Sequence, residues 1–294
     1  MNRRHLLKAS LAAMLLPMTG QTAASSFGKT LQVGIFPRRN PKTTYRMFRP
    51  LSSYLSSKMG IAIRMSTAKN FADFWKNIEN NRYDLVHFNQ YHYIVANALH
   101  GYRAIAKNEE NDLSTIAGSL IVRKDSNIQT LQDLKGKTIV FGGGPRAMQS
   151  YIIPRWLLEQ QGIDQHLYRG TFARTPPNAI MSVANRQADA AGAGDIVLHM
   201  NQVKSHINID QLDYLAKSDP MPHLPWAVSE RVDATLAEDI QRLLTGLGND
   251  TFSAHILKKA ELTGILPATD SQYDQARRII KDVYGDDYGV SALK

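Results

Sequence analysis

The 294-residue sequence contains no cysteine. This absence excludes disulfide bonds, zinc sites built from cysteine and a lipid anchor attached to a cysteine. The sequence also has no Gly-x-Ser-x-Gly elbow and no His-Glu-x-x-His metal motif, and it offers no cysteine nucleophile. We therefore expect neither an enzyme nor a bound metal or cofactor.

Acidic residues are fewer than basic ones, and the formal net charge is +9. A cationic excess favours anionic ligands. The cations are scattered along the chain, however, and no nucleic-acid-binding module is recognisable. The composition therefore indicates a mildly basic, solvated surface and no nucleic-acid partner.

Long apolar runs are missing too, and the one near the start is short. Residues 1–24 combine a basic start (Arg3, Arg4, Lys8), an apolar stretch ended by Pro17 and small residues for cleavage. This is the pattern of an export signal, and the run is shorter than the roughly 20 residues of a membrane span. We expect a soluble periplasmic protein, without a membrane span once the signal is removed. The twin-arginine and Sec export routes both stay open, as does an amphipathic first helix of the domain.

Apolar periodicity predicts strands that alternate with helices, typical of a largely parallel α/β sheet. The pattern runs to about residue 118 and then starts again, and a proline-rich segment at 218–225 predicts a second crossing between two lobes. The predicted organisation is one lobe from 28–118 plus 226–294 and a second from 119–225. Strands are expected at 31–36, 61–65, 84–88, 119–122, 137–140 and 188–193, and helices at 43–58, 71–78, 91–99, 131–134, 178–185, 236–247, 251–258 and 272–284.

The most informative segment is a glycine turn at 142–144. It follows the strand at 137–140 and precedes a helical run at 155–161. The first N–H groups of a helix lack intrahelical partners and carry the positive end of its dipole, so such a turn can bind a small anion. The spacing matches neither a P-loop nor a dinucleotide fingerprint. A plain strand-to-helix turn is the alternative.

Several motifs, in order and spacing, resemble the periplasmic substrate-binding proteins of phosphonate, phosphite and phosphate ABC importers. The resemblance implies a type II periplasmic binding protein fold, in which two α/β lobes joined by two hinge crossings close on a ligand. It also implies a monomer that captures a small anionic molecule and delivers it to an inner-membrane ABC permease. The motifs are GIFP at 34–37, YDLVHFN at 83–89, LIVRKDS at 120–126, LQDLKGK at 131–137, FG at 141–142 with IP at 153–154, SDPMP at 218–222 and DSQYD at 270–274.

The same resemblance implies the ligand-binding residues. Where the family has a Ser-Thr-Ser run, this chain has Ala147, Met148 and Gln149, so two of three hydroxyl positions lack a side-chain donor. A phosphonate dianion needs many hydrogen bonds to offset its desolvation. We therefore hypothesise a less charged or more apolar oxyanion. The full set of implied ligand contacts is Phe71, Phe88, Arg146, Ala147, Met148, Gln149, Ser150, Thr175 and Asp195.

Other readings stay open. The same clamshell can signal to a sensor kinase instead of a permease. An enzyme on a related fold would need a cleft base, for which His87 and Asp195 are the candidates. His87, His92 and His100 lie close in sequence, but a polar cleft rim or a satisfied core is favoured over a metal site, with His87 facing the cleft.

Overall fold

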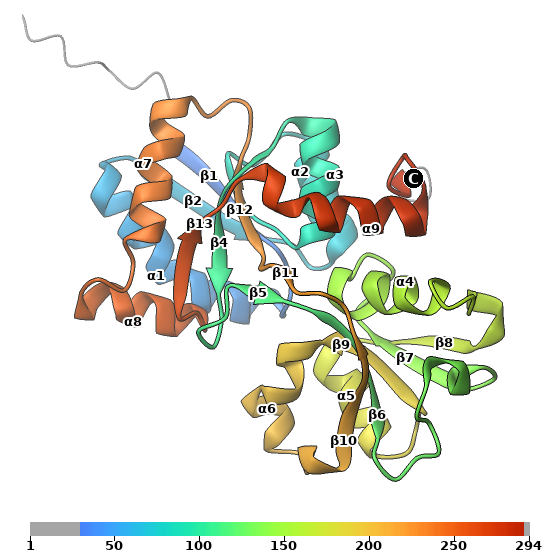
Figure 1. The fold of residues 1–294 in the computed structure, drawn as a ribbon. Helices are drawn as coiled ribbons and strands as arrows, with labels where there is room; N and C mark the ends of the chain where they lie inside the picture. Colours follow the sequence, from blue (N-terminus) through green and yellow to red (C-terminus); the bar gives the residue numbers. More distant parts are fainter. Residues whose placement is uncertain (1–29, 291–294) are drawn as a thin grey trace, which may run out of the picture.

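The computed structural model describes residues 30–290. The predicted export signal at residues 1–24 lies outside the described part of the chain. Two α/β lobes lie one above the other in Figure 1, joined by thin extended segments. Among the described residues, no helix is both long enough and apolar enough to cross a bilayer.

The first lobe is built on a six-stranded sheet in the order β13-β4-β12-β3-β1-β2. Its first three strands in the chain are parallel, whereas β12 runs antiparallel to both β3 and β4. Parallel strands place their carboxyl ends at one edge of a sheet, where ligands bind in open α/β folds. The strands are β1 (Thr30–Ile35), β2 (Ala62–Thr67), β3 (Leu85–His87), β4 (Arg103–Glu109), β12 (Pro225–Val228) and β13 (Gly264–Pro267).

Local sequence signals set the helix ends in this lobe. Asn40 caps α1 by accepting from the Thr43 N–H, Pro41 takes the first helical position, and Gly60 ends the helix in the left-handed conformation. Asn70 and Asn89 cap the next two helices in the same way. The helices of this lobe are α1 (Pro41–Met59), α2 (Phe71–Glu79), α3 (Gln90–His100), α7 (Ala234–Thr245), α8 (Thr251–Ala260) and α9 (Asp274–Tyr284).

The second lobe contains a five-stranded sheet in the order β10-β6-β9-β7-β8. Small residues in β9 let its neighbours approach: a Cβ added at Gly192 would lie 2.4 Å from the Ser150 carbonyl oxygen. The strands are β6 (Gly118–Arg123), β7 (Thr138–Gly142), β8 (Arg169–Ala173), β9 (Ala190–Gly194) and β10 (Leu212–Lys217). The helices are α4 (Ile153–Glu159), α5 (Pro176–Ala184) and α6 (Asn201–Lys204). Short 3-10 turns lie at Leu131–Leu134, Gln165–Leu167, Asp195–His199, Ile209–Gln211 and Asp270–Tyr273.

The helix after the glycine turn starts earlier than the sequence predicts. A π-helical turn, Met148–Ile152, precedes α4. The N–H groups of Tyr151 and Ile152 both donate to the Ala147 carbonyl oxygen, which widens this turn. Pro154 then takes the second position of α4 and has no N–H to donate to the preceding π-helical turn.

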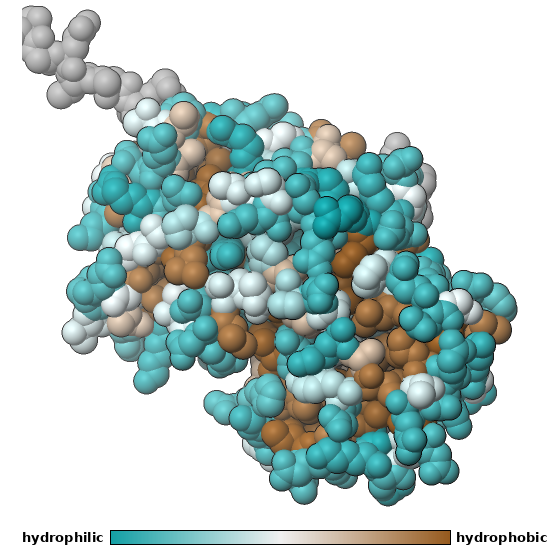
Figure 2. Space-filling view, in the orientation of Figure 1, coloured by the Kyte–Doolittle hydropathy of each residue, from teal (hydrophilic) through white to brown (hydrophobic). Residues whose placement is uncertain are grey.

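Two crossings join the lobes, and they pair with each other. The first carries β5 (Thr115–Ile116) and the second β11 (Met221–Pro222), and the two strands form an antiparallel ribbon. The chain then returns to the first lobe and ends in α9, which reaches across to α4 (Figure 1). There, the Trp156 indole N–H donates to Asp282 at 2.9 Å. Figure 2 shows apolar side chains gathered along the seam between the lobes and over the second lobe.

Candidate functional site

The two lobes meet at Pro145 and Arg146, directly after the glycine turn. The Asn89 side-chain amide of the first lobe donates to the Arg146 carbonyl oxygen at 3.1 Å, and the Tyr284 hydroxyl donates to the Pro145 carbonyl oxygen. One buried apolar cluster spans the junction, with Phe36 from one lobe and Met148 from the other. The seam therefore brings the carboxyl end of β1 and the start of α3 against the glycine turn and the helix that follows it.

On the second-lobe side, three backbone N–H groups are unpaired. Within residues 30–290, the N–H groups of Met148, Gln149 and Ser150 have no hydrogen-bond acceptor, as expected of a first helical turn. The hydroxyl of Ser150 donates to the Gly142 carbonyl oxygen, which ties the turn to β7. Met148 is 2 % exposed. These donors are partly shielded from solvent, and a hydrogen bond to an anion is stronger there than in water.

Aromatic rings form the first-lobe side of the seam. Phe71 opens α2 and lies 4.7 Å from Phe36 between ring centroids. The His92 ring lies 5.1 Å from Phe36 and 5.5 Å from Phe71. Of these three rings, only the imidazole of His92 is polar.

Burial keeps that imidazole neutral. His92 is 1 % exposed, and its burial, with a smaller contribution from the nearby Arg146 cation, lowers the pKa of His92 to about 3. Burial also raises the pKa of Tyr91 to about 12, against the opposing effect of Arg146. Arg146 is thus the cation that acts on both side chains at the seam.

The residues implied by the resemblance occupy different places. Phe71, Arg146, Ala147, Met148 and Gln149 lie at or beside the seam. Phe88 is fully buried inside the first lobe, with its ring near those of Phe74, Tyr93 and Tyr102.

Thr175 and Asp195 have local structural partners in the second lobe. The Thr175 side chain caps α5, next to Pro176, which packs on Gly142. Asp195 follows β9, and its carboxylate accepts from the Ala117 N–H at 3.1 Å.

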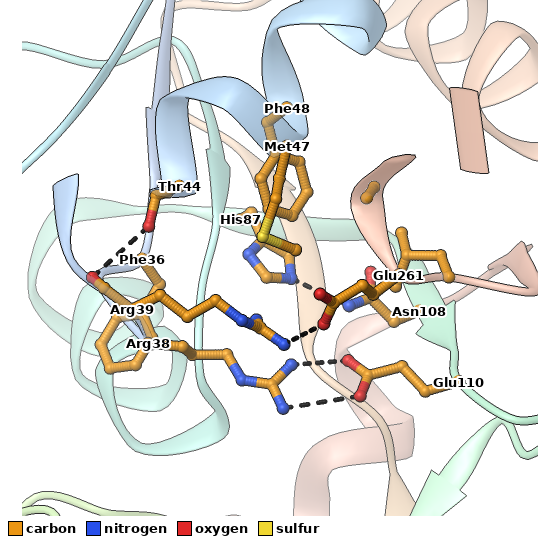
Figure 3. A pocket seen from close by; sticks show the side chains of 12 residues that line it. Phe36, Arg38, Arg39, Thr44, Met47, Phe48, His87, Asn108, Glu110 and Glu261 are labelled. Atoms are coloured by element: carbon orange, nitrogen blue, oxygen red, sulfur yellow. Dashed lines mark hydrogen bonds and ion pairs between the residues drawn. The ribbon is translucent and has the colours of Figure 1, made fainter. Parts of the chain in front are cut away.

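His87 lies away from the glycine turn, in a small cavity of about 10 Å³ in the first lobe (Figure 3). Its Nε2 lies 3.0 Å from the Asn108 amide nitrogen, and its ring packs 4.8 Å from that of Trp226. Burial, reinforced by Arg38, lowers the pKa of His87 to about 3. The three histidines do not converge, and no cluster of three or more metal-ligating side chains occurs among the described residues.

Arg38 and Arg39 cross the same cavity in Figure 3 and pair with Glu110 and Glu261. Arg38 lies 2.5 Å from Glu110. Burial alone would raise the pKa of Glu110, but Arg38 and its neighbours outweigh this effect and lower the pKa to about 2. Both arginines already pair with carboxylates, so this cavity offers an anion fewer unpaired donors than the seam does.

Sequence reasoning overlooked Asn89 and did not place His92 at the seam. The available signal was the spacing: Asn89 precedes α3 as its cap, so His92 falls on the first turn, facing the capping oxygen. Nothing in the sequence shows that Asn89 contacts Arg146, which lies 57 residues further along the chain.

Comparison with known proteins gives a consistent result. Residues 33–273 match the family model described as "ABC transporter, phosphonate, periplasmic substrate-binding protein". Among solved structures, the PhnD1 protein from Prochlorococcus marinus in complex with methylphosphonate is 18% identical, with a TM-score of 0.73 over 87% of this chain and 99% of that one.

Two further solved structures share the fold. A binding protein component of an ABC phosphonate transporter from Pseudomonas aeruginosa is 16% identical, with a TM-score of 0.72 over 90% of this chain and 94% of that one. A Xanthomonas citri protein bound to a chloride ion is also 16% identical, with a TM-score of 0.75 over 90% of this chain and 99% of that one. At such identities, the likeness concerns the fold alone.

Proposed function

Because the chain belongs to the family of periplasmic substrate-binding proteins of phosphonate ABC transporters and has their type II fold, we propose that it captures a small oxyanion between its lobes and delivers it to an ABC permease. The observation that carries the proposal is the set of three unpaired amides at Met148, Gln149 and Ser150, next to a seam that both lobes close. These amides supply hydrogen-bond donors at the place where this chain has fewer hydroxyl side chains than the family.

The groups around these amides favour an anion with an apolar or weakly polar substituent. Arg146 supplies positive charge on the second-lobe side. Across the seam, Phe36 and Phe71 offer ring faces, while Met148 offers a thioether on the same side as the amides. A phosphonate with a short substituent meets both requirements, since its oxygens can accept from the amides while the substituent lies against the rings.

Lobe closure would give the permease its signal. Asn89 and Tyr284 hydrogen-bond to the glycine turn only when the lobes meet, so a ligand that adds contacts across the seam stabilises this closed arrangement. The β5–β11 ribbon provides the two adjacent crossings about which such motion can occur.

Replacing Met148 by proline tests the amides directly. Proline removes the Met148 N–H, tolerates the first helical turn and follows a residue, Ala147, whose φ of -82° and ψ of 101° suit that position. Methylphosphonate and inorganic phosphate would be titrated calorimetrically into the mature protein. We expect affinity to fall at least about 10-fold, the loss of one charge-assisted hydrogen bond.

Met148→Leu is the matched control, because it changes the side chain and keeps the N–H. Its affinity should stay within about 2-fold of the parent. Equal binding by the proline variant would exclude the amide role. Failure of the parent to bind any phosphonate, phosphate or sulfonate would exclude the proposed function.

A further inference from the structure

Two polar side chains near the seam are buried without a partner in the described structure. They are His92, through its Nε2 atom, and Gln149, through both atoms of its carboxamide. An unpaired buried polar atom has lost its hydrogen bonds to water without replacement, and native proteins retain few such atoms. These two groups, one in the first lobe and one in the segment with the unpaired backbone amides, are explained if a ligand pairs with them.

The hydrogen-bond network fixes which proton His92 carries. The Asn89 side-chain oxygen accepts from the His92 backbone N–H at 2.8 Å. The Asn89 side-chain nitrogen donates to the Arg146 carbonyl oxygen, so both ends of the carboxamide fix its orientation. The Asn89 side-chain oxygen also lies 2.7 Å from His92 Nδ1. Nδ1 must therefore be the protonated nitrogen, and Nε2 carries a free lone pair.

A bare lone pair selects against some ligands and in favour of others. An ionised phosphonate or sulfonate oxygen would meet Nε2 as acceptor against acceptor. Burial holds the imidazole neutral at physiological pH, so His92 does not become a donor to relieve that repulsion. A ligand that presents an N–H or O–H group can satisfy this atom.

The surroundings favour a hydroxyl over an ammonium group. Asp195, the one carboxylate among the implied ligand contacts, accepts from the Ala117 N–H. The rings of Phe36 and Phe71 flank His92, and an ammonium group buried among aromatic and neutral side chains lacks the carboxylate that offsets its desolvation. A hydroxyl requires only the single acceptor that Nε2 provides.

We propose that the ligand of this protein is an oxyanion with a hydroxyl on its substituent, such as a hydroxyalkylphosphonate, and that His92 Nε2 accepts the hydrogen bond from that hydroxyl. This inference rests on the proposed function. The oxyanion takes the amides at Met148–Ser150, and the hydroxyl points to the first lobe. The Gln149 carboxamide offers its NH2 group as donor and its oxygen as acceptor for the polar atoms between them.

Calorimetric titration with a matched pair of ligands tests the proposal. Hydroxymethylphosphonate and ethylphosphonate have the same number of heavy atoms and differ by a hydroxyl in place of a methyl group. We expect the parent protein to prefer hydroxymethylphosphonate by at least about 10-fold, because the alternative leaves Nε2 unpaired. Aminomethylphosphonate, measured beside them, should bind more weakly than the hydroxyl compound.

A variant locates the preference. In His92→Phe the acceptor is gone while the ring remains, so the ratio of the two affinities should fall below about 2-fold with ethylphosphonate still bound. His100→Phe is the matched control: His100 lies on the same helix and its ring, like that of His92, packs near Trp75. It should keep the preference of the parent.

The outcomes separate the two proposals. Equal affinities of the parent for the pair, or tighter binding of the amine, would overturn the hydroxyl assignment and leave oxyanion capture standing. A preference that survives in His92→Phe would overturn the role of His92. Absence of binding to all phosphonates and to phosphate would overturn the proposed function, and this inference with it. The ligand pair alone decides the first point if the variant does not fold.

Discussion

Lowering the pH from 7 to 5 is expected to reduce the free energy of unfolding by about 6 kcal/mol, or about 2 kcal/mol for each of three buried histidines. His87, His92 and His223 are each at most 1 % exposed. Desolvation by burial is the main cause that lowers their pKa values, to about 3, 3 and 4. The folded protein therefore keeps all three neutral in this range.

The sign follows from proton binding. In the unfolded chain, the three imidazoles titrate near their ordinary pKa of about 6.5 and take up protons below it, while the folded state does not. Their neutral burial therefore costs nothing above about pH 6.5, and stability is lost progressively as the pH falls toward the folded values. Glu110 adds a second loss only below its ordinary pKa, since its own is lowered.

Urea unfolding of the mature protein at several pH values measures the effect. The slope between pH 6 and pH 5 should approach about 4 kcal/mol per pH unit, the value for three protons. His92→Phe should lower that slope by about one third. His255→Gln, which replaces an exposed histidine, should leave it as it is. A flat profile in this range would show that the three imidazoles are not buried in neutral form.

The second large effect is expected at Gly142, where a methyl group has no room. A Cβ added at this position would lie 2.3 Å from the Cα of Pro176. Since that neighbour is backbone, α5 would have to shift away from β7. Gly142→Ala should destabilise the protein by about 3 kcal/mol. It should also weaken oxyanion binding, because Ser150 anchors the amide-bearing turn to the Gly142 carbonyl.

Gly144→Ala is the control for this change. Two residues along the same turn, a Cβ at Gly144 would have nothing within 4 Å. Its thermal midpoint and its affinity for methylphosphonate should match those of the parent. If the two alanine variants had equal stability, the close packing of Pro176 on Gly142 would be wrong.

Much of the fold could be predicted from local patterns. The alternation of strands and helices predicted two α/β lobes, and the structure confirms the type II fold. Asparagine and proline at the start of α1 and glycine at its end are local signals. The helix after the glycine turn was placed too late, since the π-helical turn has no sequence signature of its own.

The candidate site could be predicted from the sequence only in part. The glycine turn and the residues after it stand out because a strand, a turn and a helix follow one another in the chain. Whether a side chain at the end of a strand or the start of a helix faces a cleft depends on tertiary packing. Phe88 is buried in the core, whereas Phe71 lies beside Phe36 at the seam. Phe88 ends a predicted strand and Phe71 begins a predicted helix, and no local signal shows which of the two is buried in the core.

The sequence by itself determined the succession of elements, the lack of cysteine chemistry and the order of strand, glycine turn and helix, because those properties depend on residues near one another in the chain. Tertiary structure alone decided that Asn89 meets Arg146, which brings His92 and its unpaired Nε2 to the seam. That outcome depends on contacts across the seam between two lobes. The ligand chemistry proposed for this protein follows from that one nitrogen.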